Sequence, residues 1–301
     1  MDFSHWSASV AVLAVYVVVA VTHLLGMRGA ATDARRLGRS LAPGLLAQAV
    51  IFQIGLLMVL LALVSPMGYY AHRLIWVRNL QDVVLAIVGP ALIVLGAPWQ
   101  PLRRGFRLSG PHRQRPGTAD AADEQRDADG GSGGWQAVSI AVVVGFCAIW
   151  WAWHAPVLFD AALRSPLVYA AEVVTYLGVG ILLWLQLVGS RPFKPRLAPL
   201  RRVVLLLGVA ASGTVLGLIR VYSSGLAYPT YLGVRHHVLS VVADQQLGGA
   251  VLWVIPLLPF SILAVALVVG WLNDDEAEEA AGLDRLLKTR KSAWPSRPGL
   301  R

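Results

Sequence analysis

The sequence predicts an all-α, polytopic membrane protein built as a seven-transmembrane-helix bundle. Hydrophobic residues make up 56% of the 301 residues and charged residues only 14%, whereas a soluble globular domain has about 25% charged residues. The mean hydropathy of the chain is +0.60. So few charges could not cover so much apolar surface in water, which excludes a soluble enzyme. Seven apolar segments and an alternating distribution of basic residues supply the details of this prediction.

Seven segments are long enough to cross a bilayer, which takes about 20 mostly apolar residues. They are 6–26, 41–64, 74–96, 135–153, 167–188, 203–221 and 247–272. The last contains Pro256 and Pro259, so we expect it to be kinked or tilted. We predict a membrane domain over 1–272, a disordered cytoplasmic loop over 105–134 and a cytoplasmic tail over 273–301.

The basic residues predict how the bundle is oriented. Of the 26 Lys and Arg residues, 21 lie in the tail or in the connections after the first, third and fifth spans. Because basic residues gather in cytoplasmic loops, we expect the N-terminus outside and the C-terminus in the cytoplasm. Membrane topology also accounts for the net charge of +9, so we expect the lipid bilayer as a partner and no nucleic acid. No basic residue precedes the first apolar run, so we interpret it as a retained span and not a signal peptide.

Several chemistries are excluded by residues that the chain lacks. The single cysteine, Cys147, excludes an internal disulfide and any CxxC motif. No lysine falls inside a span, so a retinal Schiff base cannot form. No P-loop, GxSxG or HExxH motif occurs, and the chain is expected not to be an enzyme. Trp150, Trp151 and Trp153, at the outer end of the fourth span, are typical of an aromatic belt.

Polar residues inside the spans are the place to look for function, because charges in a membrane are costly. Arg78, Gln81 and Asp82 share one face of the third span. Arg78 and Asp82 are either a structural ion pair or part of a functional site. Glu172 shares a face of the fifth span with Tyr169 and needs a cation, a donor or a proton.

Two further motifs bring polar residues to the outer ends of spans. His154 ends the fourth span, where it is either a hydrogen-bonding residue or a metal ligand, and Asp160 follows it. Asp244 and Gln245 precede the seventh span, where Asp244 is placed to cap that helix. The glycines at 248–249 would allow close helix contact. We predict one outer polar cluster made of Arg78, Gln81, Asp82, His154, Asp160, Glu172, Asp244 and Gln245.

Four stretches carry a family resemblance. They read P-A-L-I-V-L-G-A-P at 90–98, W-H-A-P-V-L-F-D-A-A-L at 153–163, Y-P-T-Y at 228–231 and D-Q-Q-L-G-G…W at 244–253. Their order and spacing, over about residues 60–272, resemble the CtaG-type (caa-type) cytochrome c oxidase assembly proteins of bacteria. The second and fourth stretches are the most specific.

The resemblance implies a multi-pass protein of the bacterial plasma membrane that helps cytochrome c oxidase to mature or receive copper. Its partners would be oxidase subunits or other assembly factors. Copper is therefore a possible ligand, and Cu(I) suits imidazole and thioether groups.

The chain departs from the family pattern in two spans. Where the resemblance leads us to expect H-M-x-Q-H, residues 78–82 read R-N-L-Q-D, and only Gln81 matches. Where it leads us to expect H-x-x-E-H, residues 169–173 read Y-A-A-E-V, and only Glu172 matches. Four expected histidines are missing, which weakens the case for metal binding.

His154 is left as the candidate metal ligand, with His72 and the histidines at 236–237 nearby in the sequence. Our hypothesis is that the fixed charge of Arg78 takes the place of a bound cation. Two alternatives stay open beside the assembly role: a membrane transporter or channel for a small solute or ion, and a copper-independent structural scaffold.

Overall fold

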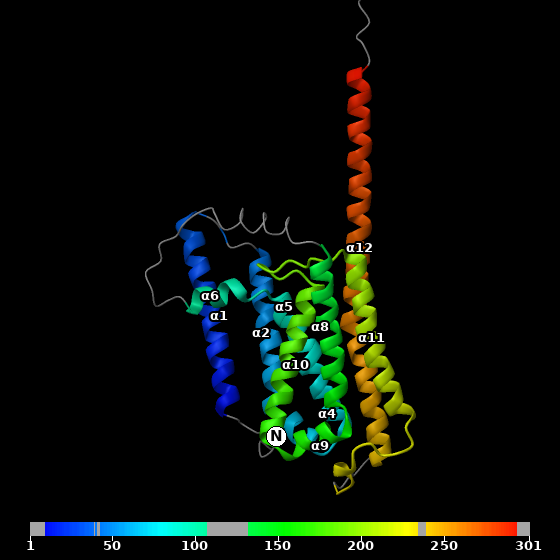
Figure 1. The fold of residues 1–301 in the computed structure, drawn as a ribbon. Helices are drawn as coiled ribbons and strands as arrows, with labels where there is room; N and C mark the ends of the chain where they lie inside the picture. Colours follow the sequence, from blue (N-terminus) through cyan, green and yellow to red (C-terminus); the bar gives the residue numbers. More distant parts are fainter. Residues whose placement is uncertain (1–9, 39, 41–42, 107–131, 234–238, 294–301) are drawn as a thin grey trace, which may run out of the picture.

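The computed structural model describes residues 10–38, 40, 43–106, 132–233 and 239–293, and the described part contains helices and no strands (Figure 1). The elements are α1 (Val10–Arg36), α2 (Pro43–Val64), α3 (Pro66–Ala71), α4 (Ile75–Val83), η2 (Val84–Val88), α5 (Gly89–Leu95), α6 (Trp99–Phe106), α8 (Ser132–Trp153), α9 (Pro156–Arg164), α10 (Pro166–Leu187), α11 (Pro199–Tyr222), η3 (Pro229–Gly233) and α12 (Val241–Ala293). The all-α fold class is confirmed.

Seven of these helical segments are long and apolar enough to cross a membrane, as predicted. The first runs ten residues beyond its predicted end, to Arg36, and the last continues from the seventh span to Ala293. Much of the predicted tail is therefore the end of α12, and residues 294–301 lie outside the described residues. The predicted loop over 105–134 is helical at both edges, and its interior, 107–131, also lies outside the described residues.

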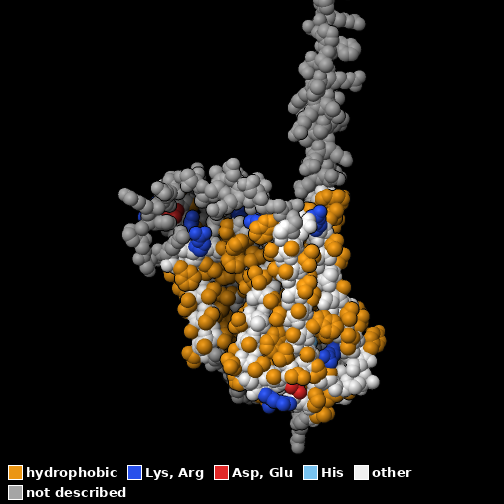
Figure 2. All heavy atoms as spheres, in the orientation of Figure 1, with side chains coloured by type: hydrophobic (Ala, Val, Ile, Leu, Met, Phe, Trp, Pro, Cys, Tyr) orange, Lys and Arg blue, Asp and Glu red, His pale blue; other side chains and the backbone are white. Residues whose placement is uncertain are grey.

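The visible face of the bundle carries the pattern that a membrane requires. Hydrophobic side chains cover its middle, while Lys and Arg side chains lie toward the two ends (Figure 2). At one end, which we call the basic end, α1 finishes in Arg35 and Arg36 and α6 lies across α1. At the other, the ionic end, α4 and α9 begin.

The third span, formed by α4, η2 and α5, is the centre of the bundle. Of its most apolar window, 78% is buried, compared with 17–28% for the other six spans. It packs against α2, α10 and α12. Side chains on every face of this span therefore meet protein, and only this span can carry several charges away from lipid.

A π-helical turn lies in the middle of the third span. The Gly89 N–H bonds to the Val84 carbonyl five residues earlier, and Pro90 follows, without an N–H of its own. The Ala86 carbonyl faces Gly180 of α10 so closely that a Cβ on Gly180 would overlap it. The absence of a side chain at Gly180 therefore sets the distance between the third and fifth spans.

The helices α11 and α12 also cross through glycines. A Cβ built on Gly217 would lie 2.7 Å from the Gly249 carbonyl oxygen, and one on Gly249 would lie 2.7 Å from the Gly217 oxygen. Gly248 faces Asn79 of α4, which confirms the close contact expected at 248–249. Pro256 and Pro259 lie inside α12, which continues past both of them as one helix.

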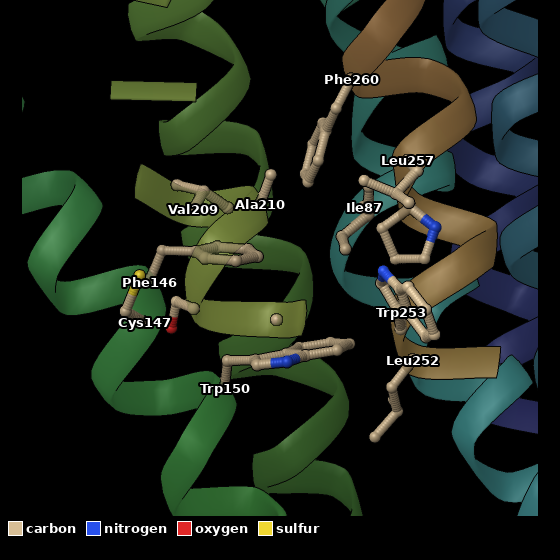
Figure 3. Close-up of a pocket in the computed structure, with 13 residues that line it drawn as sticks. Ile87, Phe146, Cys147, Trp150, Val209, Ala210, Leu252, Trp253, Leu257 and Phe260 are labelled. Atoms are coloured by element: carbon tan, nitrogen blue, oxygen red, sulfur yellow. The ribbon is translucent and has the colours of Figure 1, made fainter. Parts of the chain in front are cut away.

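The predicted aromatic belt is wrong for two of the three tryptophans at the end of the fourth span. Trp150 and Trp153 are buried in the bundle, and only Trp151 is exposed. The physical reason is that Trp150 stacks on Phe146 within α8 and lines a small apolar pocket between α8, α11, α12 and η2 (Figure 3). This pocket has a volume of about 10 Å³, which is no more than one water molecule needs.

Candidate functional site

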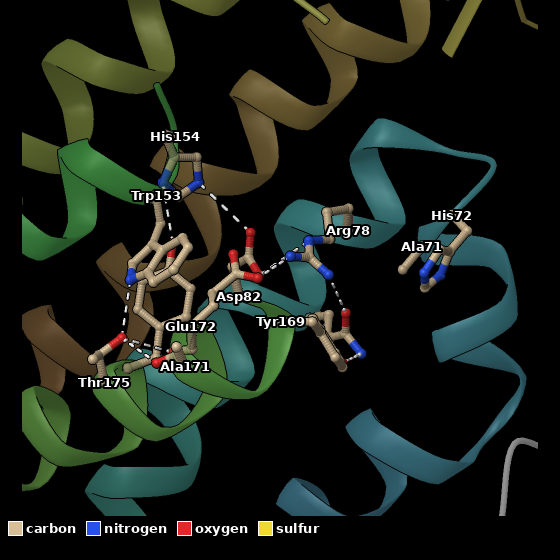
Figure 4. Close-up of polar contacts among 12 residues, drawn as sticks. Ala71, His72, Arg78, Asp82, Trp153, His154, Tyr169, Ala171, Glu172 and Thr175 are labelled. Atoms are coloured by element: carbon tan, nitrogen blue, oxygen red, sulfur yellow. Dashed lines mark hydrogen bonds and ion pairs between the residues drawn. The ribbon is translucent and has the colours of Figure 1, made fainter. Parts of the chain in front are cut away.

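Arg78 lies at the middle of a buried ionic group at the ionic end. Its Nη2 donates a hydrogen bond to Oε2 of Glu172 on α10, and its Nε lies 3.7 Å from Oδ1 of Asp82, one turn along α4 (Figure 4). All three side chains are at most 2% exposed. A guanidinium stays protonated in proteins, so it supplies a permanent positive charge to these two acidic groups.

Gln81 attaches this group to the surrounding helices. Its Nε2 donates to the Ala62 carbonyl of α2 at 2.6 Å and to the Tyr169 hydroxyl of α10 at 2.9 Å. Its Oε1 lies 3.5 Å from Nη1 of Arg78, at the limit of a hydrogen bond. The Arg78 guanidinium also lies 4.9 Å from the centroid of the Tyr169 ring, which adds a cation–π contact.

His154 joins the group from the end of α8. Its Nδ1–H donates to the Trp150 carbonyl at 2.7 Å, since a carbonyl can only accept. Its Nε2 is then the unprotonated nitrogen and lies 3.8 Å from Oδ2 of Asp82. Burial lowers the pKa of the His154 imidazole, which keeps it neutral. We call Arg78, Gln81, Asp82, His154 and Glu172 the ionic core.

The connection between α11 and α12 covers the ionic core. The His154 carbonyl accepts hydrogen bonds from Arg220 Nη2 at 2.7 Å and from the Tyr228 hydroxyl at 3.0 Å. Tyr228 stacks on Phe159 of α9 with ring centroids 4.0 Å apart, and the Tyr231 hydroxyl donates to the Ala71 carbonyl at 2.6 Å. Burial raises the pKa of both tyrosines, so their hydroxyls remain donors.

Arg220, Tyr228 and Tyr231 were not among the predicted site residues. The Y-P-T-Y stretch was a signal for the two tyrosines, because a resemblance motif lay in an otherwise irregular connection. Arg220 also carried a signal, because it is a charged residue inside the predicted span 203–221.

Asp244 and Gln245 hold the backbone around the ionic core, outside the ion pairs themselves. The Asp244 carboxylate accepts hydrogen bonds from the backbone N–H groups of Ile75 and Trp76, at 2.8 and 3.1 Å. It therefore caps α4, whereas we had expected it to cap its own helix, α12. The amide of Gln245 accepts from the Ala227 N–H and donates to the Gly225 carbonyl, which fixes the covering connection.

The remaining predicted residues lie apart from the ionic core. Oδ2 of Asp160 lies 3.7 Å from Nη2 of Arg164, one turn along α9, and its side chain is 15% exposed. His72 lies away from the ionic core (Figure 4). It is exposed, and its Nδ1 is hydrogen-bonded to the Gly68 carbonyl at 2.8 Å. The histidines at 236–237 lie outside the described residues. The single predicted cluster is thus an ionic core with Asp244 and Gln245 beside it and Asp160 on the neighbouring helix α9.

The donor set of the ionic core does not fit copper. Copper(I) prefers thiolate, thioether and imidazole groups, and the core offers one imidazole nitrogen beside two carboxylates. A guanidinium, which cannot act as a ligand, lies between those carboxylates. Among residues 10–106 and 132–293, so far as they are described, no three His, Cys, Asp or Glu side chains are placed to hold a metal ion. The geometry instead supports an internal ion-pair network that joins α4 to α10, with the neutral His154 ring at the end of α8 packed beside it.

Comparisons with known proteins agree with the resemblance seen in the motifs. A family model described as cytochrome c oxidase caa3 assembly factor matches residues 28–274. Uncharacterized proteins of Mycobacterium leprae and Mycobacterium tuberculosis are 31% and 32% identical to the chain over 120 residues. These matches cover 39% of this chain and only 18% of the relatives' own length. No solved structure matches the chain.

Proposed function

The chain belongs to the cytochrome c oxidase caa3 assembly factor family, and from this premise we propose that it helps a bacterial cytochrome c oxidase to assemble in the plasma membrane. The role is that of a non-catalytic membrane partner, which contacts an oxidase subunit or another assembly factor. The single observation that carries the proposal is the family match, which extends over residues 28–274 and thus over most of the seven-helix bundle.

The residues that carry the resemblance shape the ionic end of the bundle. His154 accepts two hydrogen bonds at its carbonyl and joins the ionic core through its ring. Asp244 caps α4, and Gln245 fixes the connection that covers the core. These residues are therefore suited to maintain a defined surface at this end, which a protein partner would recognise.

We propose further that this assembly role needs no resident copper in the ionic core. Arg78 already supplies a positive charge to Glu172 and Asp82 and ties α4 to α10. A second cation in the same place would be repelled by the guanidinium. Copper held elsewhere, or passing between partners, is a separate question from the role of this core.

A strain in which the gene is deleted tests the assembly role. The reduced-minus-oxidised haem spectrum of the membranes and the amount of assembled oxidase on native gels should both fall, and the wild-type gene should restore them. Unchanged spectra and unchanged assembly in the deletion strain would contradict the role. The same strain complemented with His154→Gln should recover assembled oxidase.

Metal analysis of the purified chain tests the copper-independent core separately. We expect well under one copper per chain after exposure to Cu(I), with no difference between the wild type and His154→Gln. Near-stoichiometric copper that is lost in His154→Gln would overturn this part and leave the assembly role standing.

The transporter alternative has less support than the assembly role. In the described residues the ionic core is buried, and the apolar pocket beside the third span has a volume of only about 10 Å³. A solute path would need polar groups that face water, which these observations do not favour. Solute or ion flux in proteoliposomes that is abolished by Glu172→Gln would favour transport instead.

A further inference from the structure

A groove lies at the basic end of the bundle, opposite the ionic core. Its volume is about 470 Å³, within the range of roughly 300–1,000 Å³ that is typical of small-molecule sites. The lining residues come from α6 and from the connection between α10 and α11, and they are Trp99, Leu102, Arg103, Phe106, Pro192 and Phe193. The groove therefore combines apolar walls with one arginine.

The walls of this groove are fixed by specific contacts. The Trp99 Nε1–H donates to Oγ of Ser190 at 2.7 Å, and that hydroxyl donates to the Val94 carbonyl at 2.6 Å. The Trp99 and Phe193 rings meet edge to face, with centroids 5.4 Å apart. This network connects α6 and the 188–195 connection to the third span, so both sides of the groove keep their relative position.

On the side away from the groove, α6 is held in place by close packing against α1. A Cβ on Gly26 of α1 would overlap the Pro101 carbonyl of α6, and a Cβ on Gly105 of α6 would overlap the Thr22 carbonyl of α1. The helix α6 thus lies directly against α1 at the basic end (Figure 1). Its Trp99, Leu102 and Phe106 recur at helical spacing on one face, as in helices that lie in a membrane interface.

The charges beside the groove favour an anion. Within the described part of the chain, Arg104 pairs with Asp33 at 4.0 Å, whereas no carboxylate pairs with Arg103. Arg191 and Lys194 flank Pro192 and Phe193 in the sequence, and both are exposed. Because no carboxylate among the described residues pairs with Arg103, its guanidinium is free to hold a phosphate at the mouth of the groove. Arginine binds phosphate with two parallel hydrogen bonds.

From these observations we propose that this groove binds an anionic phospholipid. The Arg103 guanidinium holds the lipid phosphate, and the first part of an acyl chain lies between Phe106 and Phe193, which are 65% and 49% exposed. Basic pockets beside transmembrane helices bind anionic head groups in this way. The inference does not depend on the proposed function, because the groove lies at the opposite end of the bundle from the ionic core.

Lipid retention by the purified full chain tests the site. The chain is exchanged into phosphatidylcholine that contains one-tenth phosphatidylglycerol, and native mass spectrometry then measures the bound lipid. The wild type should retain phosphatidylglycerol at least fivefold above its share of the mixture. Arg103→Gln should lower this enrichment at least threefold. The matched control is Arg35→Gln, which removes an exposed arginine at the same end of the bundle without touching the groove, and it should leave the enrichment unchanged.

Two outcomes of this measurement would overturn the proposal. One is equal retention of phosphatidylglycerol and phosphatidylcholine by the wild type. The other is an equal fall in Arg103→Gln and Arg35→Gln, which would show only a general attraction to positive charge.

A photoreactive residue in place of Phe193 gives a second and independent measurement. Crosslinks to phosphatidylglycerol support the site even if Arg103→Gln reduces the yield of folded protein. Crosslinks to the chain's own residues 107–131, with no crosslinked lipid, would make that segment the occupant and overturn the proposal.

Discussion

The third span and the six spans around it differ in what surrounds their side chains: the third is mostly enclosed by protein, whereas the other six are mostly exposed on the surface of the bundle. In the third, 78% of the most apolar window is buried and the mean hydropathy of that window is 1.6, the lowest of the seven. In the seventh, 17% of the window is buried and its mean hydropathy is 2.6. The comparison shows that charges are tolerated within this bundle where protein replaces lipid as the surroundings. Low hydropathy alone does not mark such a span, because the fourth has a mean hydropathy of 1.7 with only 22% of its window buried.

The largest expected effect comes from Arg78→Leu, which removes the positive charge from the buried third span. Removing the guanidinium leaves the Glu172 and Asp82 carboxyl groups buried without their shared cation. We expect a loss of about 3–5 kcal/mol in the free energy of unfolding, measured by denaturant titration in detergent micelles. Arg164→Leu, at an arginine whose side chain is 70% exposed, should change it little. Equal stability of the two variants would show that the ionic core is not required.

A smaller loss is expected where the central span touches its neighbour. In Gly180→Ala the new methyl group would overlap the Ala86 carbonyl, so α10 must move away from the third span. Such overpacking costs about 1–3 kcal/mol of unfolding free energy. Gly178→Ala is the matched control on the same helix, because nothing lies within 4 Å of its added Cβ. A control as unstable as Gly180→Ala would refute the close contact.

Asp244→Ala would remove the cap from the first turn of α4 and leave the ionic groups of the third span unchanged. The backbone N–H groups of Ile75 and Trp76 would lose their acceptor, which costs about 1–2 kcal/mol. Asp244→Asn keeps one acceptor oxygen and should lose less. Ser240→Ala removes an exposed cap at Ala243, and its thermal midpoint should shift less than that of Asp244→Ala. The reverse order would show that Asp244 is not the important cap.

The smallest effect is expected on the lipid-facing side of the comparison. Val204 of α11 is 67% exposed, so Val204→Ala should change the free energy of unfolding by no more than about 0.5 kcal/mol. The titration used for Arg78→Leu measures this as well. A loss above about 1 kcal/mol would place this face of α11 against another protein instead of lipid.

Span number and position could be predicted from the sequence because each depends on a local run of apolar residues. The segment 74–96, for example, became a continuous helix over Ile75–Leu95 despite Pro90. The overextension of α1 to Arg36 was missed because hydropathy marks where the membrane ends and not where the helix ends. Helical spacing also placed Arg78, Gln81 and Asp82 correctly on one face.

Partner choice could not be predicted, because it depends on how the helices pack. Nothing in the sequence shows that Asp244 reaches back 169 residues to cap α4, or that Glu172 receives the hydrogen bond of Arg78 while Asp82 lies farther away. Trp150 and Trp153 were placed in a belt because composition alone cannot distinguish a lipid-facing tryptophan from one inside the bundle. The orientation of the termini remains a prediction from the basic residues.

The burial of the third span has a consequence for how the protein enters the membrane. An arginine or an aspartate costs about 2.5–3.5 kcal/mol on insertion scales at the centre of an isolated helix. This is an upper bound for Arg78 and Asp82, which lie in the first half of the span Ile75–Leu95. The translocation machinery would release such a helix into lipid reluctantly. We therefore expect the third span to stay beside the insertion channel until α10 is synthesised, because Glu172, 94 residues later in the chain, is the partner of Arg78. Biogenesis would then depend on the fifth span being made before the third can settle.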